Sequence, residues 1–335
     1  MTRRGARCDH ESMRAIQIQR TGGPEVLELV DVELPPPGPG EATVRHTAIG
    51  VNLIDTYHRS GLYSLPGLPH GLGTEAAGIV EAVGEGVEIP LGRRVGYFQG
   101  PPRSYAEARN VPADRLVRIP DAVGDAVAAA ALLKGMTVEY LIRRTFAVQP
   151  GMTVLFHAAA GGVGTIACQW LSHLGATVIG TVSTEAKAEH ARKNGCAHPI
   201  LYTQEDFVER VRAITDGAGV PVVYDSVGKD TFDGSLDCLA PRGMLVAFGN
   251  ASGKPGPFDP MRLVEKGSLF LTRASLFHYV ATQEELAASA KALFDVIASG
   301  AVKIHIGQQF ALEDARACHE ALESRQTVGS TLLVP

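Results

Sequence analysis

Hydrophobic and polar residues alternate through the first third of the chain. Clusters of Gly and Pro separate the alternating segments, which are MRAIQIQR (13–20), VLELVDVEL (26–34), EATVRHTAIGVN (41–52) and AAGIVEAVGEGV (76–87). A period of two predicts half-buried strands. Between two of them, LPPPGPGE (34–41) predicts a stiff turn. This part of the chain is therefore expected to be an irregular, mostly β domain.

The pattern changes after about residue 122. Residues 125–144 form an Ala-rich run typical of a helix, and short apolar segments then alternate with amphipathic ones. The apolar segments are MTVLFHAA (152–159), ATVIGTV (176–182), HPILY (198–202), PVVYDSVG (221–228) and GMLVAFGN (243–250). Such alternation is typical of βαβ units in a doubly wound parallel sheet. We predict a Rossmann-like domain over 136–273, with SLFLTRASL (268–276) as the last strand.

The last quarter of the chain begins with a predicted helix over 282–300. Thr282 is its expected N-cap, Glu285 stands three residues later, and Gly300 ends the run. The segments that follow look β-rich again, with one short helix: VKIHIGQQF (302–310), LEDARACHEALES (312–324) and GSTLLVP (329–335). The predicted organisation is a disordered extension at 1–12, a first domain formed by 13–135 and 274–335, and the Rossmann-like domain.

Composition narrows the class of protein. Of 335 residues, 45% are apolar and 20% are charged, which is ordinary for a globular enzyme of two domains. The formal net charge of -5 and the pI near 6.1 disfavour binding to nucleic acid, which usually needs a basic face. No apolar run approaches the roughly 20 residues that cross a bilayer. The opening MTRRGARCDHES lacks the apolar stretch of a secretory signal.

The five cysteines are odd in number and widely spaced, and none forms a C-x-x-C pair. They are Cys8, Cys168, Cys196, Cys238 and Cys318. We expect free thiols in a cytoplasmic protein.

The stretch AAAGGVG (158–164) resembles a nucleotide-binding turn. The G-x-G-x-x-G spacing falls on Ala159, Gly161 and Gly164, with an apolar strand before it and an amphipathic helix after it. An alanine at the first position costs little if it keeps a negative φ. The turn predicts dinucleotide binding at the helix start, and a purely structural tight turn is the alternative.

The second strand of this region ends without a carboxylate. NAD-binding proteins usually place Asp or Glu there for the ribose hydroxyls, whereas this chain has Ser183, with Glu185 and Lys187 following. Small hydroxyl residues beside a lysine suit a 2′-phosphate, which favours NADPH. The alternative is that Lys187 is an ordinary solvated helix lysine.

Other chemistries lack their motifs. The sequence contains no G-x-S-x-G elbow, no H-E-x-x-H helix and no Cys/His cluster with ligand spacing. Isolated histidines such as His46, His157 and His278 are expected to be packed or exposed rather than ligands. Hydride transfer from a nicotinamide remains, with the protein supplying binding and orientation.

The chain resembles the medium-chain dehydrogenase/reductase superfamily, and within it the NADPH:quinone oxidoreductases related to zeta-crystallin. The resemblance runs from about Met13 to Pro335. It rests on GGPEVLEL (22–29), AIGVNLIDTYHRSGLY (48–63), GTEAAGIVEAVGEGV (73–87), LLKGMTVEYL (132–141), HAAAGGVG (157–164), VVYDSVGKDT (222–231) and LVAFGNASG (245–253). It implies an α/β fold: a GroES-like β-rich catalytic domain beside a Rossmann NADPH-binding domain, with the cofactor in the cleft.

The same resemblance implies that zinc is absent. Zinc alcohol dehydrogenases of the superfamily carry Cys where this chain has Asn52 and His where it has Thr74, and their four-cysteine loop is missing after Val95. Without a Lewis acid, reduction of an already electrophilic acceptor is favoured over oxidation of simple alcohols.

The resemblance also implies the cofactor-binding residues. Those for the pyrophosphate are Ala160, Gly161, Gly162 and Val163, and those for the 2′-phosphate are Ser183, Lys187 and Tyr202. The remaining cofactor residues are Asn52, Asp55, Lys134, Thr137, Ser226, Phe248, Gly249, Asn250, Ser275 and Arg325. Alternatively, Asp55 is a helix cap and Phe248 a core residue.

Tyr57, Tyr63 and Asn52 are the expected catalytic residues. A flat quinone stacks on an aromatic face, and a phenol hydroxyl donates to its oxygen as charge develops. Relatives are commonly homodimers that pair their last Rossmann strands, and SLFLTRASL has an apolar edge for such pairing.

Three functions remain open. The first is an NADPH-dependent quinone reductase, and the second is a reductase of the conjugated double bond of an enone or 2-alkenal. The third is a binding role, as in relatives that serve as lens crystallins or bind AU-rich RNA, which the acidic balance disfavours.

Overall fold

The computed structural model describes residues 11–324 and 327–335, which form two compact units. Within these ranges the first unit comprises residues 11–130, 308–324 and 331–335, and the second comprises 131–307 and 327–330. Of the predicted extension, residues 1–10 lie outside the described range. Residues 11 and 12 do not belong to an extension, because they begin strand β1, where Glu11 pairs with Leu34 and Ser12 with Glu33.

The first unit is built mainly from strands. They are β1 (Glu11–Ile18), β2 (Glu28–Leu34), β3 (Glu41–Val51), β4 (His70–Gly71), β5 (Glu75–Val83), β6 (Arg94–Tyr97), β7 (Ala108–Pro112), β8 (Val117–Arg118), β15 (Ile306–Ala311) and β16 (Ser330–Val334). One sheet has the order β2-β1-β4, and a larger one has the order β15-β16-β3-β5-β6-β8 with β7 on β3. The prediction of an irregular β unit is confirmed, and residues 34–41 form the turn between β2 and β3.

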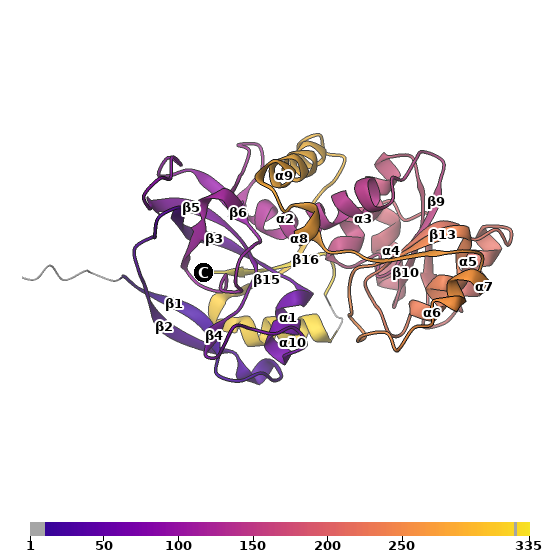
Figure 1. Ribbon diagram of the computed structural model, residues 1–335, viewed down its shortest axis with the longest axis horizontal. Coiled ribbons are helices and arrows are strands. Elements are labelled where there is room, and N and C mark those ends of the chain that lie inside the picture. Colours follow the sequence, from indigo (N-terminus) through magenta and orange to yellow (C-terminus); the bar gives the residue numbers. More distant parts are fainter. Residues whose placement is uncertain (1–10, 325–326) are drawn as a thin grey trace, which may run out of the picture. The chain divides into compact units, whose positions relative to one another are not determined.

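Two helices complete this unit, α1 (Leu53–Ser60) and α10 (Ala315–Glu323), and they lie near each other in Figure 1. Helix α1 begins directly after β3, because Asn52 takes the extended N-cap conformation and Asp55 at the third helical position accepts a hydrogen bond from the Asn52 N–H. It ends at Gly61, which has a φ of 83°. The core beside it contains Ile18, Ile49 and Tyr105.

The second unit alternates strands with helices (Figure 1). Its strands are β9 (Thr153–Phe156), β10 (Thr177–Val182), β11 (His198–Leu201), β12 (Val220–Asp225), β13 (Leu239–Ala247) and β14 (Phe270–Arg273). Its helices are α3 (Gly162–His173), α4 (Glu185–Lys193), α5 (Phe207–Ile214), α6 (Phe232–Asp237), α7 (Met261–Glu265), α8 (Leu276–Tyr279) and α9 (Gln283–Ala298), and α2 (Asp125–Tyr140) enters it from the first unit.

The six strands of the second unit pair in parallel in the order β11-β10-β9-β12-β13-β14. The chain moves outward from β9 to β11, then returns to β12 and moves outward on the other side. Because βαβ crossovers are right-handed, α3 and α4 cover one face and α6 covers the other. The predicted doubly wound sheet, with β14 at one edge, is confirmed.

The contacts differ from the predicted domain boundaries at residues 274–307, which group with the second unit. The reason is the packing of α9 on α2. The Ser289 hydroxyl donates to Glu139 at 2.8 Å, and Leu293 fills the space beside Gly135. Helix α9 has the predicted capping box of Thr282 and Glu285. The chain then returns to the first unit, where β16 pairs with β3.

Among the residues that the structure describes, no helix has the length and apolar character needed to span a bilayer. The four described cysteines are free and buried, whereas Cys8 lies outside the described range.

Candidate active site

The glycine-rich turn joins β9 to α3. Its first alanine, Ala158, takes the left-handed conformation with a φ of 55°, and the chain then runs through Ala159 and Ala160 to Gly161, the extended N-cap of α3. The N–H groups of Gly162, Val163 and Gly164 lie in the first helical turn, where an α-helix has no internal acceptor for them. The sequence therefore forms the predicted strand–turn–helix.

The side chains around this turn explain its composition. Ala159 is fully buried and is not among the described residues with positive φ, and its methyl group lies against Gly180 of β10. A Cβ at Gly180 would lie 2.5 Å from the Ala159 Cβ, and one at Gly164 would lie 2.2 Å from the Ala158 oxygen. A Cβ at Gly161, by contrast, would have one neighbour, at 3.3 Å. The turn is thus tightly packed at Ala159 and Gly164 and open at Gly161.

Another strand end supports the same turn. Gly329 forms an isolated parallel bridge with Gly161, and its N–H donates to the Ala160 oxygen at 3.2 Å. Gly162 faces the Lys134 stem, since a Cβ there would lie 2.9 Å from two of its carbons.

A buried polar network fixes the start of the turn. Ser235 donates to Asp225 Oδ2 at 2.8 Å, so it accepts from His157 Nε2 at 3.0 Å. The other ring nitrogen, Nδ1, is then an acceptor for the Thr181 hydroxyl at 2.9 Å, and Thr181 in turn accepts from the Ala158 N–H. Burial lowers the pKa of His157, so the neutral imidazole is favoured. His157 is packed, as predicted, and holds three strand ends together.

The residues predicted for a 2′-phosphate gather at the ends of β10 and β11. Val182 pairs with Leu201, so Ser183 and Tyr202 follow at the same edge of the sheet. Lys187 lies half-buried in the first turn of α4, where its N–H donates to the Thr184 side chain. The nearby Glu185 is paired with Arg192 at 2.9 Å. Two hydroxyls, a lysine and an engaged carboxylate fit NADPH better than NADH.

The remaining cofactor candidates of the second unit follow later strands or lie on α2. Ser226 follows β12, and Phe248, Gly249 and Asn250 follow β13, the edge at which this fold binds ligands. Gly249 allows close approach, because a Cβ there would lie 2.5 Å from the Ser226 oxygen. Phe248 packs 5.8 Å from Phe156 between ring centroids, which gives it a core contact as well.

Four further candidates remain, and the structure describes three of them. Ser275 is the N-cap of α8, just after β14. Lys134 and Thr137 are buried on α2, and the Thr137 hydroxyl donates to the Leu133 oxygen. Arg325 lies outside the described residues.

In the first unit, Asn52 and Asp55 are buried at the start of α1. The Asn52 amide donates to Glu75 Oε2 at 2.8 Å, which follows from the pairing of Gly50 with Glu75. Asp55 is fully buried and accepts from the Asn52 N–H, the Tyr105 hydroxyl and the Thr74 hydroxyl. The geometry favours the alternative for Asp55: it caps the helix and is saturated by protein donors.

Tyr57 and Tyr63 form an edge-to-face pair. Their ring centroids are 5.2 Å apart with an angle of 69° between the ring planes, and the Tyr63 backbone N–H donates to the Tyr57 backbone carbonyl oxygen. Both rings are half-buried, so part of each aromatic surface faces solvent. The two predicted acceptor residues therefore lie together.

The positions compared with zinc enzymes carry hydrogen-bonded amide and hydroxyl groups. Asn52 is bonded to Glu75, and Thr74 to Asp55. Within 11–324 and 327–335, no group of three or more His, Cys, Asp or Glu side chains is arranged to hold a metal ion. The amide of Asn52 and the hydroxyl of Thr74 are not the thiolate and imidazole donors that zinc prefers.

Sequence reasoning missed several buried polar residues around these candidates. They are Glu75 and Tyr105 beside Asn52 and Asp55, Arg59 and His319 behind them, and Thr181, Asp225 and Ser235 below the turn. The signal for Glu75 is a carboxylate in an otherwise apolar strand, GTEAAGIV, directly opposite Gly50.

A GroES-like unit and a Rossmann unit with a nucleotide-binding turn define a dehydrogenase or reductase of the medium-chain type. Two family models match this division: the alcohol dehydrogenase GroES-like domain at residues 38–121 and the zinc-binding dehydrogenase domain at 162–294.

Relatives match nearly the whole chain. A quinone oxidoreductase of Pseudomonas aeruginosa is 51% identical over 96% of this chain and 99% of its own, and a 2-haloacrylate reductase of Burkholderia sp. is 47% identical over 96% and 98%. The structure of Escherichia coli quinone oxidoreductase complexed with NADPH has a TM-score of 0.95 and 50% identity, covering 96% of this chain and all of that one. The chain belongs to the quinone oxidoreductase family of the medium-chain dehydrogenase/reductase superfamily.

Proposed function

We propose that this protein is an NADPH-dependent quinone oxidoreductase that works without zinc. The observation that carries the proposal is the edge formed by Ser183, Lys187 and Tyr202 beside the AAAGGVG turn, in a chain 50% identical to an enzyme solved with NADPH. When bound, NADPH supplies the hydride.

The protein residues have separate tasks in this proposal. The N–H groups of Gly162 and Val163 bind the pyrophosphate, and Lys187 with Ser183 binds the 2′-phosphate. Tyr57 and Tyr63 stack on the flat acceptor, and a Tyr57 hydroxyl donates a hydrogen bond to its oxygen as negative charge develops. Asn52 orients the nicotinamide end through its buried amide.

We also propose a cytoplasmic homodimer. Strand β14 is at the edge of its sheet, and Phe270 on it is 57% exposed. Pairing of two β14 strands across a two-fold axis would cover this apolar edge. Sedimentation at micromolar concentration tests it, and a monomer would contradict it.

The second candidate function is reduction of a conjugated double bond. The 47% identical 2-haloacrylate reductase favours it, since a halogenated acrylate is also an electron-poor acceptor. The two candidate functions differ in the acceptor, and we propose NADPH as the cofactor for either.

A single substrate panel separates the candidates. Oxidation of NADPH and of NADH is followed at 340 nm with 1,4-benzoquinone, a naphthoquinone, 2-chloroacrylate and an enone, at equal enzyme concentration. We expect the highest kcat/KM with NADPH and a quinone, and activity that persists after chelation. Preference for the acrylate or the enone over every quinone would establish the second candidate instead.

A further inference from the structure

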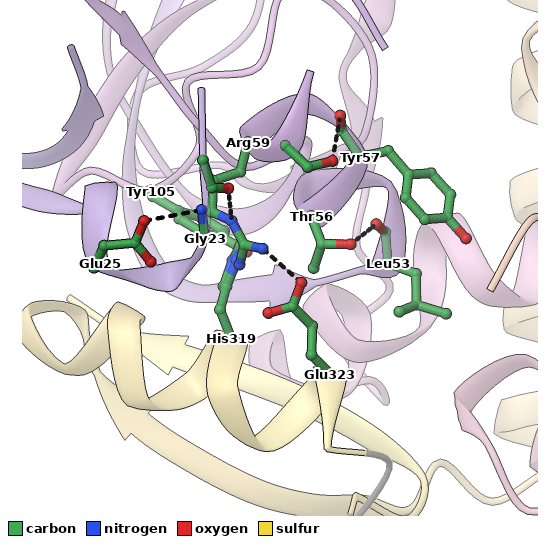
Figure 2. A network of polar contacts seen from close by, with 11 residues as sticks. Gly23, Glu25, Leu53, Thr56, Tyr57, Arg59, Tyr105, His319 and Glu323 are labelled. Carbon is green, nitrogen blue, oxygen red and sulfur yellow. Dashed lines mark hydrogen bonds and ion pairs between the residues drawn. The ribbon is translucent and has the colours of Figure 1, made fainter. Parts of the chain in front are cut away.

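A buried cation anchors the end of α1 to α10 in the first unit (Figure 2). The Arg59 side chain is 2% exposed. Its Nη2 contacts Glu323 Oε1 at 2.5 Å, its Nε donates to the Gly22 oxygen at 3.1 Å, and its Nη1 lies 3.0 Å from His319 Nδ1. Since a guanidinium only donates, His319 Nδ1 must be the acceptor.

That constraint sets the direction of every hydrogen bond beyond it. A neutral His319 with an unprotonated Nδ1 carries its proton on Nε2, which lies 3.0 Å from the Tyr105 hydroxyl. Tyr105 therefore accepts from His319 and donates to Asp55 Oδ2 at 3.0 Å. Burial lowers the pKa of His319 to about 3, and burial with the Asp55 charge raises that of Tyr105 well above its usual value. Near neutral pH, His319 therefore stays neutral with a single ring proton, and Tyr105 keeps its hydroxyl proton.

The chain of contacts ends on the first turn of α1. Asp55 accepts from the Asn52 N–H at 2.9 Å and from Thr74 at 3.1 Å. Asn52 caps the helix, Asp55 lies in its first turn and Arg59 in its last, with Tyr57 between them. A rotation of the Asp55 carboxylate would therefore disturb the cap of this helix, and with it Asn52 and Tyr57, two of the three candidate catalytic residues.

We propose that Arg59, His319 and Tyr105 are positioning residues of the reductase: they fix the Asp55 carboxylate and thereby hold Asn52 and Tyr57 in the orientation that turnover requires. The proposal rests on the proposed function for the roles of Asn52 and Tyr57. None of the three residues needs to touch cofactor or acceptor.

The first unit also contains a matched control. Tyr97 is as deeply buried as Tyr105, and its hydroxyl contacts a buried histidine, His46, at 2.8 Å. In this second pair His46 Nδ1 lies 2.7 Å from the Ala106 oxygen, and Tyr97 also interacts with the Ser104 and Arg109 side chains. Tyr97→Phe thus removes the same group from the same kind of pair, and these partners lie outside α1.

The test compares Tyr105→Phe with Tyr97→Phe. We expect both to lower the urea midpoint. Only Tyr105→Phe should lower kcat with the best acceptor, by about tenfold, because a displaced cap misplaces the reacting groups. The Kd for NADPH, measured by fluorescence, should stay within about twofold for both, given the positioning role of the network. Equal kcat for both variants would overturn the proposal.

Two substitutions at position 319 separate loss of the hydrogen bond from loss of folding. His319→Gln retains an N–H donor toward Tyr105, whereas His319→Leu does not. We expect Gln to retain most of kcat and Leu to lose it, at temperatures where both are folded by circular dichroism. Equal losses in the two would exclude the hydrogen-bond direction proposed here.

Amide exchange separates this proposal from the proposed function. The Asn52 N–H should exchange faster in Tyr105→Phe than in wild type and should be unchanged in Tyr97→Phe, whatever the enzyme reduces. Unchanged Asn52 exchange in Tyr105→Phe would overturn the positioning role. A wild-type protein inactive with every quinone would overturn the proposed function alone.

Discussion

Ala159 occupies the position at which a nucleotide-binding turn usually has glycine, and Gly180 on the neighbouring strand provides the space for its methyl group. Fingerprint turns carry glycine at the first position so that the strand can bend tightly. Here the left-handed φ falls on Ala158, and the room for the Ala159 methyl group comes from Gly180 on the next strand. The missing glycine is thus compensated by a contact between strands.

This contact predicts the effect of Gly180→Ala. The new methyl group would lie 2.5 Å from the Ala159 Cβ and 2.7 Å from Cys196 Sγ. We expect a loss of about 1–3 kcal/mol of unfolding free energy, as in overpacked cores. Adding Ala159→Gly to this variant should restore part of the unfolding free energy, because it removes the contact with the Ala159 methyl group. The restoration should be partial, because the contact with Cys196 remains. Urea unfolding measures both, and additive losses would contradict the compensation.

Lys187 gives a second prediction at this scale. Lys187→Ala should weaken NADPH by about 10- to 100-fold, because a charge-assisted hydrogen bond contributes roughly 1.5–3 kcal/mol, and should leave NADH nearly unchanged. Lys193→Ala is the control on the same helix, since its side chain is 72% exposed and pairs with Glu189. Isothermal titration gives both constants, and equal losses for the two cofactors would refute the 2′-phosphate assignment.

At the scale of the element, α1 combines a buried face with a face that carries the proposed catalytic ring. Asp55 and Arg59 point into the first unit, whereas the Tyr57 ring pairs with Tyr63 and stays half-buried. The capping box and Gly61 fix both ends of this eight-residue helix. Helices this short have little stability of their own, so tertiary contacts must hold it.

Tyr57→Phe tests the exposed face. The change removes one hydroxyl and keeps the ring, so we expect kcat with a quinone to fall by about 10- to 100-fold, with NADPH affinity unchanged. Tyr279→Phe, which removes a hydroxyl bonded to Thr145, should leave kcat unchanged. Stopped-flow and steady-state kinetics measure these rates. An unchanged kcat in Tyr57→Phe would mean that the ring only packs.

Local sequence patterns predicted most helices and strands, whereas they could not predict the contacts between side chains of different elements. The period of two located β1, β2, β3 and β5, and the capping residues located α9. The partnership of Asn52 with Glu75 depends on the register of β3 against β5, which has irregular shifts. Likewise, His319 comes from a helix far along the chain, and no local pattern brings it to Tyr105. The Gly-rich turn was recognisable because its chemistry is local.

For the whole molecule, several buried histidines link stability to pH. Burial lowers the pKa of His46 to about 4 and that of His319 to about 3. The unfolded chain binds these protons near pH 6.5, so the folded state loses stability as pH falls below that value. Each histidine contributes a loss of about 1.4 kcal/mol between pH 7.5 and 5.5.

Urea unfolding at these two pH values measures the loss. In His46→Asn the difference between the pH values should shrink by about 1.4 kcal/mol, because one titrating group is removed. His278→Asn, which removes a histidine at an exposed position, is the control variant. A wild-type free energy that does not fall toward pH 5.5 would contradict the neutral, buried state of these rings.

The bridge between Gly161 and Gly329 has a consequence for synthesis of the protein. The AAAGGVG turn leaves the ribosome well before Gly329, whose N–H donates to the Ala160 oxygen. A nascent chain that has already paired β9 with β10 still lacks this neighbour. A partly synthesised chain therefore presents this turn with one of its backbone contacts still unmade.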